Sequence, residues 1–279
     1  MQVHFLGVRG STPAPGSEFV RYGGNTSSIA VSHHGRSPDL LLDAGTGLRR
    51  LAAVLGGEPY RGSLLLSHLH WDHTHGLPFS RPIDHPDSVV DLYVPAQPRA
   101  SALAALRQSM GPPSFPITPD QLRGRWTFDS LEEGTHHLDG YTVVAADVPH
   151  KGGRTFGYRI SDGTAAIAYL PDHGPAALGP GADGLGVLHP AALALAGRAD
   201  LLIHDAQHTA SEFPDRAEFG HSAIDYAVAL GRAAGVGCVA LFHHDPNRTD
   251  AELDAVARRF DGAVSPTVIV AREGLRLDL

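Results

Sequence analysis

The sequence has almost no cysteine, since Cys238 is the only one among 279 residues. A disulfide within the chain and a cysteine-rich zinc site are therefore excluded. Cys238 lies in the apolar stretch GVGCVALF, which predicts a buried structural thiol. The start, MQVHFLGVRGS, lacks the pattern of a signal peptide, and no apolar run approaches the ~20 residues of a membrane-spanning helix. These absences predict a cytoplasmic protein that makes no membrane contact.

Positive charge is also scarce. The chain has 22 Lys and Arg residues against 30 Asp and Glu residues, a formal net charge of −8. Such a balance argues against a large nucleic-acid surface, which has to neutralise many phosphates. A small anionic substrate is not excluded, because a bound metal ion can dominate the local field.

Strand-like and helix-like segments alternate along the chain, and no linker or internal repeat divides it. This pattern predicts one α/β domain over residues 1–279, with two mixed sheets covered by helices on the outside. Thr46 and Ser222 are the expected N-caps of two helices, and 111–124, with four prolines, is expected to be a loop or flap. The expected strands are 1–8, 27–33, 39–45, 62–67, 91–96, 125–131, 141–150, 155–160, 165–172, 199–206 and 237–243; the expected helices are 45–57, 99–110, 221–235 and 250–260; a hairpin is expected over 266–279.

In the stretch LLLSHLHWDHTH, a cluster of histidines directly follows an apolar run that predicts a strand. Imidazole and carboxylate groups are ligands for Zn²⁺, Mn²⁺ and Fe²⁺. At the end of a strand, His68 and His70 can face one side, while a following turn directs Asp72 and His73 to a second point nearby. This spacing suits two metal ions about 3.5–4 Å apart, as in two-metal hydrolases.

Further residues of ligand type follow other strands. His150, Asp172 and His243 each come directly after an apolar run. Because α/β folds place their chemistry at the carboxyl ends of strands, we expect these side chains to complete both metal sites. His243 is preferred to His244 because it ends its strand directly.

These residues resemble the metallo-β-lactamase fold superfamily, whose HxHxDH signature SHLHWDHTHGLP matches completely. The resemblance extends from GVRGS to HHDP and implies a four-layer αββα sandwich with two divalent metal ions. Zinc is the first choice, with Mn²⁺ or Fe²⁺ as alternatives. A hydroxide between the metals would be the nucleophile, oriented by Asp72. The implied ligands are His68, His70 and His150 for one metal, Asp72, His73 and His243 for the other, and Asp172 as a bridge.

Other segments point to one branch of the superfamily. GVRGSTPAP and RYGGNTSS resemble the start of the ribonuclease Z and cyclic-phosphate phosphodiesterase branch, and HDAQHT with FGHSA resembles its segment that carries a catalytic histidine. That histidine is His221 here, and it would donate a proton to the leaving oxygen of a phosphodiester. Two residues argue against other classes of the superfamily. Asp172 takes the place of the Cys that common antibiotic-hydrolysing lactamases have, and His70 takes the place of the Glu that diiron flavoproteins have.

The expected substrate is a small anionic phosphodiester, such as a cyclic nucleotide or a cyclic sugar phosphate. Ribonuclease Z carries a basic tRNA-clamping arm between the ligands that match His150 and Asp172, whereas only residues 151–171 lie there in this chain. Together with the acidic balance, this argues against tRNA as a partner. The resemblance also suggests a homodimer.

Two alternatives stay open. One is a lactonase, thioesterase or lactamase that uses the same metals in an apolar pocket, and the other is a metal-binding accessory protein without hydrolysis. Phe115 in the 111–124 loop is expected either to wall the pocket or to contact a second subunit. Three residues stay open as substrate contacts: Asn25, Lys151 and Arg154. Five further histidines are expected to orient metal ligands or to have structural roles: His75, His173, His204, His208 and His244.

Overall fold

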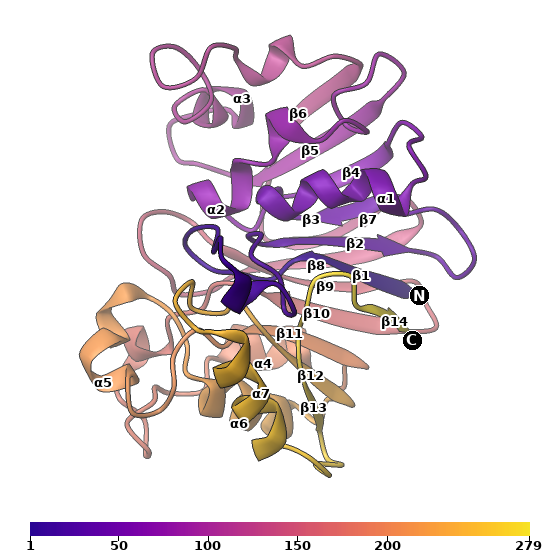
Figure 1. Cartoon of the computed structure of the whole chain (residues 1–279). Coiled ribbons are helices and arrows are strands. Elements are labelled where there is room, and N and C mark those ends of the chain that lie inside the picture. Colours follow the sequence, from indigo (N-terminus) through magenta and orange to yellow (C-terminus); the bar gives the residue numbers. More distant parts are fainter.

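Short apolar strands, many buried on both faces, form the centre of the protein. The computed structural model describes residues 1–279 and places these strands in two seven-stranded sheets. Helices cover the two outer faces of the pair (Figure 1), so the predicted four-layer αββα fold is confirmed.

The first sheet is built by the N-terminal half of the chain and one C-terminal strand. Its strands β3 to β6 are parallel, and the pairs that join β14, β1, β2 and β3 are antiparallel. In spatial order the strands are β14 (Arg276–Asp278), β1 (Gln2–Gly7), β2 (Ser28–Ser32), β3 (Leu40–Leu42), β4 (Arg61–Leu65), β5 (Val89–Pro95) and β6 (Arg125–Leu131).

The second sheet repeats this arrangement. Its strands β10 to β13 are parallel, and β7 to β10 pair in an antiparallel manner. In spatial order the strands are β13 (Thr267–Val270), β12 (Cys238–Phe242), β11 (Leu201–Asp205), β10 (Ala166–Leu170), β9 (Phe156–Ser161), β8 (Tyr141–Asp147) and β7 (Gly134–Leu138).

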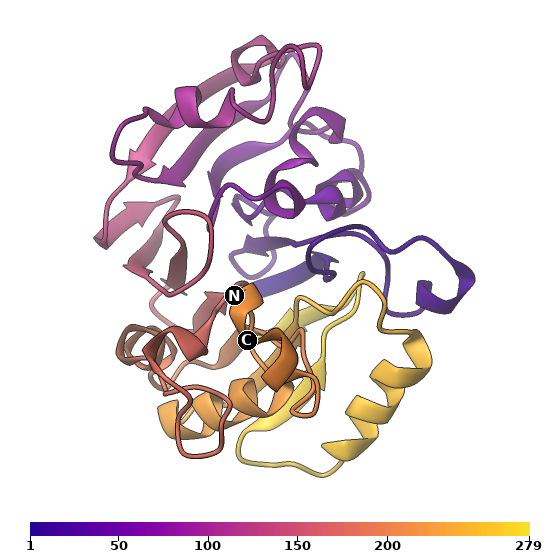
Figure 2. The ribbon, with the colours of Figure 1, turned by 90° about the vertical axis from the view of Figure 1, so that its left-hand side faces the viewer.

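Three apolar clusters separate the four layers. The largest, which includes Phe5, Tyr158 and Phe242, lies between the sheets, and the other two lie under the outer helices. Seen from the side, the two halves of the chain form facing layers (Figure 2). The helices are α1 (Leu51–Val54), α2 (Trp71–Thr74), α3 (Ala102–Leu106), α4 (Pro190–Ala196), α5 (Phe213–Arg216), α6 (Ile224–Ala234) and α7 (Asp250–Arg259), and short 3₁₀ helices cover Ser17–Phe19, Thr46–Arg50, Leu77–Phe79, Pro119–Gln121, Pro175–Leu178 and Ala217–Phe219. None of the helices has the length and apolar character needed to cross a membrane.

Several local expectations were wrong. The last two strands do not form a hairpin, because β13 pairs with β12 while β14 crosses to pair with β1 in the other sheet. Neither expected cap serves its helix. The Thr46 hydroxyl accepts a hydrogen bond from the Thr26 amide at 2.9 Å, and the Ser222 hydroxyl donates to the His173 carbonyl at 2.6 Å. Both hydroxyls therefore tie loops together rather than start helices.

Candidate metal centre

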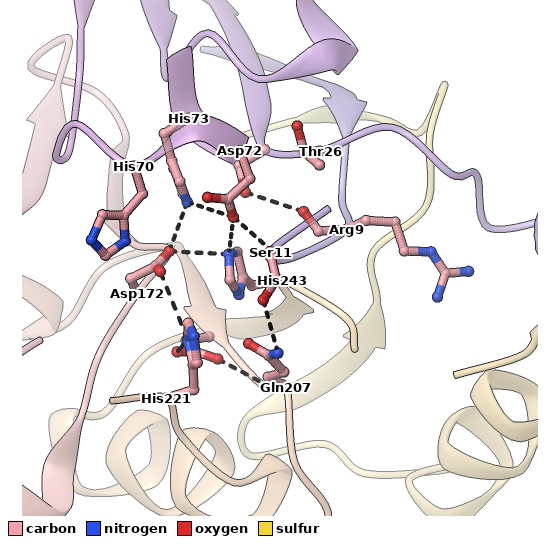
Figure 3. Close-up of polar contacts among 12 residues, drawn as sticks. Arg9, Ser11, Thr26, His70, Asp72, His73, Asp172, Gln207, His221 and His243 are labelled. Atoms are coloured by element: carbon pink, nitrogen blue, oxygen red, sulfur yellow. Dashed lines mark hydrogen bonds and ion pairs between the residues drawn. The ribbon is translucent and has the colours of Figure 1, made fainter. Parts of the chain in front are cut away.

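The residues expected to bind metals meet where strands of both sheets end. His68 follows β4, and His70, Asp72 and His73 lie at or in α2. The other three, His150, Asp172 and His243, follow strands β8, β10 and β12 of the second sheet. Because the carboxyl ends of the parallel strands face the same edge, the two sheets present their polar side chains to one another (Figure 3).

Asp172 lies at the middle of this cluster. Its Oδ1 is 3.0 Å from His73 Nε2 and 3.2 Å from His243 Nε2. Its Oδ2 is 3.3 Å from His150 Nε2 and 3.7 Å from His68 Nε2. One carboxylate thus faces two separate sets of imidazoles, one through each oxygen.

Residues of metal-ligand type form three compact groups, each with its members within 4.8 Å of one another, and the third overlaps the first two. Asp72 Oδ2 belongs to the second group and lies 3.3 Å from His73 Nε2 and 3.1 Å from His243 Nε2. The groups are His68, His70, His150 and Asp172; Asp72, His73 and His243; and Asp172, His221 and His243.

The chemistry of these atoms fits cations. His68 Nε2, His73 Nε2 and Asp172 Oδ1 are buried without a hydrogen-bond partner, a costly arrangement unless another group pairs with them. Burial disfavours a protonated His73, but Asp72, Asp172 and Asp43 outweigh burial and raise its pKa well above the ordinary value. The cluster therefore attracts positive charge, and divalent cations would supply it to these oxygen and nitrogen ligands.

Outer hydrogen bonds orient the imidazoles. His73 Nδ1 donates to Asp43 Oδ2 at 2.7 Å, and His150 Nδ1 donates to the Gly220 carbonyl at 2.7 Å. Each bond leaves Nε2 as the nitrogen that faces the cluster, as is usual for metal-binding histidines.

Asp43, which the sequence analysis gave no role, holds His73 of the second group and Ser67, which precedes His68. It directly follows β3 with φ of 59°, and it accepts hydrogen bonds from the Ser67 amide (2.6 Å) and hydroxyl (2.8 Å). It also accepts from the Tyr169 hydroxyl at 2.8 Å. Its place directly after the apolar run DLLL was the available signal, the same signal that indicated Asp172.

His221 lies beside the cluster and is held by a second carboxylate that sequence reasoning missed. Its Nδ1 is 3.0 Å from Asp205 Oδ2 and 3.7 Å from Asp172 Oδ2. Burial disfavours the imidazolium, but Asp205 and then Asp172 outweigh burial and raise the pKa of His221 to about 9. The Ser222 amide donates to the same Asp205 oxygen at 3.2 Å. Asp205 ends β11 within HDAQHT, so its strand-end position was again the available signal.

His243, not its neighbour, faces the cluster. It has φ of 56°, a left-handed backbone that turns its ring toward Asp72 and Asp172. His244 points away and donates from Nε2 to the Ala271 carbonyl at 2.8 Å, and burial lowers its pKa to about 3.

The remaining histidines lie around the cluster in different settings. His75 stacks against Trp71, with ring centroids 5.5 Å apart. His173 Nδ1 lies 3.0 Å from His204 Nε2, and His204 Nδ1 donates to the Asp205 carbonyl at 2.7 Å. His208 is buried with no hydrogen-bond partner on either ring nitrogen.

The three residues left open as substrate contacts differ in position. Asn25 is turned away, because its amide nitrogen Nδ2 donates to Glu273 Oε2 at 3.0 Å. Lys151 is exposed beside His150. Arg154 lines a cavity of about 760 Å³ that reaches His68 and His70. Phe115 instead packs against Phe79 around a separate apolar cavity of about 280 Å³.

A second opening leads directly to the cluster. It is a cavity of about 360 Å³ lined by Ser11, Asp72, Asp172 and His221, among others. Trp71 and His70 line both this cavity and the one of about 760 Å³. A ligand can therefore reach the cluster and extend past Trp71 into the larger space.

Comparison with known families decides the relationship. Residues 39–244, which contain all seven expected ligands, match the model described as "Beta-lactamase superfamily domain". The chain belongs to this superfamily. Ribonuclease Z of Synechococcus sp. (strain CC9311) is 28% identical over 327 aligned residues, covering 100% of this chain and 99% of that protein. Together these findings make the chain a superfamily hydrolase, as predicted.

Solved structures agree in fold. A diphosphatase of the PhnP family superposes with a TM-score of 0.71 at 18% identity, covering 100% of this chain and 97% of that one. The short form of human tRNase Z superposes with a TM-score of 0.62 at 20% identity, covering 100% of this chain and 99% of that one.

The expectation that tRNA is not a partner was wrong. Residues 151–171 do hold only β9, β10 and their loops, yet relatives named ribonuclease Z match the chain along its whole length. The absence of an arm describes only the segment 151–171, and the net charge is a sum over the whole chain. Neither quantity describes the charges close to the cluster, which decide whether a phosphate backbone can bind there.

Proposed function

We propose that this superfamily member is a phosphodiester hydrolase that uses two divalent metal ions, zinc in the first instance. The observation that carries the proposal is the Asp172 carboxylate, whose two oxygens face two groups of ligand atoms with His221 alongside. A bridging carboxylate between two such groups is the arrangement expected of a two-metal hydrolase.

The seven residues would divide as the resemblance implies. His68, His70 and His150 would hold one ion, Asp72, His73 and His243 the other, and Asp172 both. When bound, such ions neutralise charge on phosphoryl oxygens and make water a stronger acid. Asp72 has little freedom to move a proton, because its Oδ2 already accepts from the Ser11 amide at 2.7 Å and contacts two histidines. Its part is to hold and orient.

His221 would serve as the general acid. Asp205 accepts the Nδ1 hydrogen of His221, which leaves Nε2 to donate a proton into the cavity that its ring lines. In hydrolysis a water oxygen bonds to phosphorus and the bond to the leaving oxygen breaks. The leaving oxygen takes the proton from His221 Nε2, and His221 regains a proton from the water that was consumed. Asp205 favours the protonated ring and fixes its orientation.

The first experiment measures metal content and hydrolysis of bis-p-nitrophenyl phosphate by wild type, His221→Ala and Asp205→Asn. We expect two equivalents of metal, and a loss in kcat of about 100-fold for His221→Ala. Asp205→Asn should lose less, because the ring remains present but loosely oriented. Exposed His34→Ala is the matched control and should match wild type.

Three results would count against the proposal. Less than one metal per chain after reconstitution would remove the two-metal centre. Two metals without turnover of any phosphodiester, RNA included, would return the choice to lactones and thioesters. Equal activity of His221→Ala and wild type would remove His221 as the acid.

A further inference from the structure

The cavity of about 760 Å³ extends from the cluster along a route that the proposed chemistry does not use. It begins at His68 and His70, passes Trp71, and reaches Gln97, Arg99 and Arg154. Its volume falls within the range of sites that bind small molecules and cofactors. We refer to it as the Arg99 cavity.

The charges of the Arg99 cavity differ from those of the protein as a whole. The chain carries a net charge of −8, yet no carboxylate is among the residues that line this cavity. Arg154 is neutralised by Asp147 at 3.0 Å and Glu132 at 2.8 Å. Arg99, by contrast, is exposed and forms no salt bridge. Its guanidinium group is therefore available to an anion that enters the cavity.

Trp71 lines both the Arg99 cavity and the cavity of about 360 Å³ that opens onto Asp72 and Asp172. Trp71 is 67% exposed, although it lies in the sequence between two expected ligands, His70 and Asp72. Exposing so much of an apolar indole to water costs free energy. One side of the ring is supported by His75, which stacks at an interplanar angle of 18°. The ring is thus held in place while much of its surface remains open, as in an aromatic platform for a planar ligand.

Part of the lining of the Arg99 cavity is glycine backbone. Gly152 and Gly153 have φ of 83° and 147°, conformations that suit glycine. A Cβ at Gly152 would lie 2.7 Å from His70 Nε2, whereas at Gly153 it would meet open space. A substrate can therefore approach the main chain closely on this side.

We propose that the Arg99 cavity binds a nucleotide next to the scissile phosphodiester, with its base stacked on Trp71 and its second phosphate paired with Arg99. This inference rests on the proposed function, since it assumes that a phosphodiester occupies the cluster. The Arg99 cavity is lined by an aromatic platform, Trp71, and by an unpaired guanidinium, Arg99. Together they favour a ligand that carries both an aromatic ring and a second anionic group. A lactone or a simple sugar phosphate offers only one of these groups or neither.

Three substrates with one leaving group separate the two contacts. They are methyl p-nitrophenyl phosphate, thymidine 5′-(p-nitrophenyl phosphate), and the latter with a 3′-phosphate. We expect Arg99→Ala to lower kcat/KM about fivefold for the 3′-phosphorylated substrate alone. Exposed and unpaired Arg36, in the turn between β2 and β3, gives the matched control Arg36→Ala, which should change none of the three.

Trp71→Leu should lower kcat/KM about tenfold for both nucleotides and leave the methyl ester unchanged. Trp71→Phe, which keeps an aromatic ring, should restore most of the loss. Unchanged metal content in both variants would exclude damage to the neighbouring ligands. Equal losses on all three substrates would make Trp71 merely structural and would overturn the stacking.

A binding measurement separates this inference from the proposed hydrolysis. The chain has only Trp71 and Trp126, so in a Trp126→Phe background the fluorescence reports Trp71 alone. Thymidine 3′,5′-bisphosphate should quench it saturably in the metal-loaded protein, and Arg99→Ala should weaken binding about fivefold. Quenching without hydrolysis of any diester would reject the proposed function and retain the nucleotide site. Hydrolysis without saturable quenching, or without substrate-dependent losses, would reject the nucleotide site and retain the function.

Discussion

Asp43 acts on the metal centre without facing the space between the ligand groups. Four donors converge on its two oxygens, and one of them is His73 Nδ1. An aspartate accepts all of these hydrogen bonds because it is an acceptor at both oxygens, whereas an asparagine has only one acceptor atom. Asp43 also supplies negative charge that keeps His73 a strong ligand.

Asp43→Asn should therefore lower metal affinity about 10- to 100-fold while the seven ligands remain. Competition with a coloured chelator measures the affinity. Asp39→Asn is the matched control, because Asp39 lies at the opposite end of β3 and accepts from the Tyr141 hydroxyl. Equal affinities for the two variants would mean that the hydrogen bond to His73 is not needed.

Glu212 is a second carboxylate whose surroundings favour its charge, and it is not among the expected metal ligands. It accepts from Arg248 at 2.6 Å and from the Thr209 amide at 2.8 Å. Burial alone would raise its pKa, but these hydrogen bonds outweigh burial and lower the pKa to about 2 from an ordinary value of 4.5. Because the folded-state pKa is depressed, the stabilisation is fully present above pH 4.5 and is lost as pH falls toward 2.

Glu212→Gln should lower the free energy of unfolding by about 1 kcal/mol at pH 7, a value reduced for solvent screening. The difference from wild type should shrink between pH 4.5 and about 2. Urea unfolding of metal-free protein measures it without contributions from pH-dependent metal binding, and the titration of the cluster is common to both proteins. Exposed Glu58→Gln should show little difference at any pH, and a Glu212→Gln difference that stays constant with pH would refute the ionic origin.

At the scale of elements, α6 shows how a glycine can be favoured inside a helix. Gly231 lies on the buried face of α6 against β12. A Cβ there would lie 2.3 Å from Val239 Cγ2 and 3.3 Å from Val236 Cγ2. The helix can approach the sheet this closely only because residue 231 has no side chain.

Gly231→Ala should therefore destabilise the protein by about 1–3 kcal/mol, although alanine is the better helix former by about 1 kcal/mol. Thermal unfolding measures the change. Adding Val239→Ala should recover part of the loss, because it removes the clashing methyl group. A stabilised Gly231→Ala variant would show that the helix moves away at little cost.

Element prediction succeeded where a periodic pattern was long and local. The expected helix 221–235 corresponds to α6, and its expected stop, Gly235, has the left-handed φ of 68° that ends such helices. Partnership between distant strands could not be predicted in the same way. The segment 266–279 reads as a hairpin locally, yet β13 and β14 each complete a different sheet. The edge strand β7 was not among the expected strands, because it has no buried apolar face.

For the site, too, local patterns could be predicted and long-range partners could not. A dense motif and strand ends predicted seven side chains that do meet, while their roles as ligands stay a prediction. Asp43 and Asp205 occupy equivalent strand ends, but a single carboxylate there does not reveal its partners. Their partners, His73 and His221, come from segments that only the folded chain brings near. A homodimer and a cytoplasmic location also stay predictions.

For the whole molecule, the candidate metal centre joins the two sheets. His68, His70, Asp72 and His73 follow the first sheet, whereas His150, Asp172 and His243 follow the second. Metal ions held between them would connect the two halves of the sandwich beyond their shared apolar core. Removing the ions would leave buried ligand atoms unpaired at the junction.

Chelation should therefore lower Tm by about 5–10 °C, since a ligand at about 100 times its Kd adds about 2.7 kcal/mol. Hydrogen exchange should then increase at the strand ends of both sheets, around β4 and β10 together. Asp172→Asn, which loses the bridging charge, should respond less to the chelator than wild type. A faster exchange confined to one sheet would mean that the ions bind to one half only, because a bridge that breaks must free the strand ends on both of its sides.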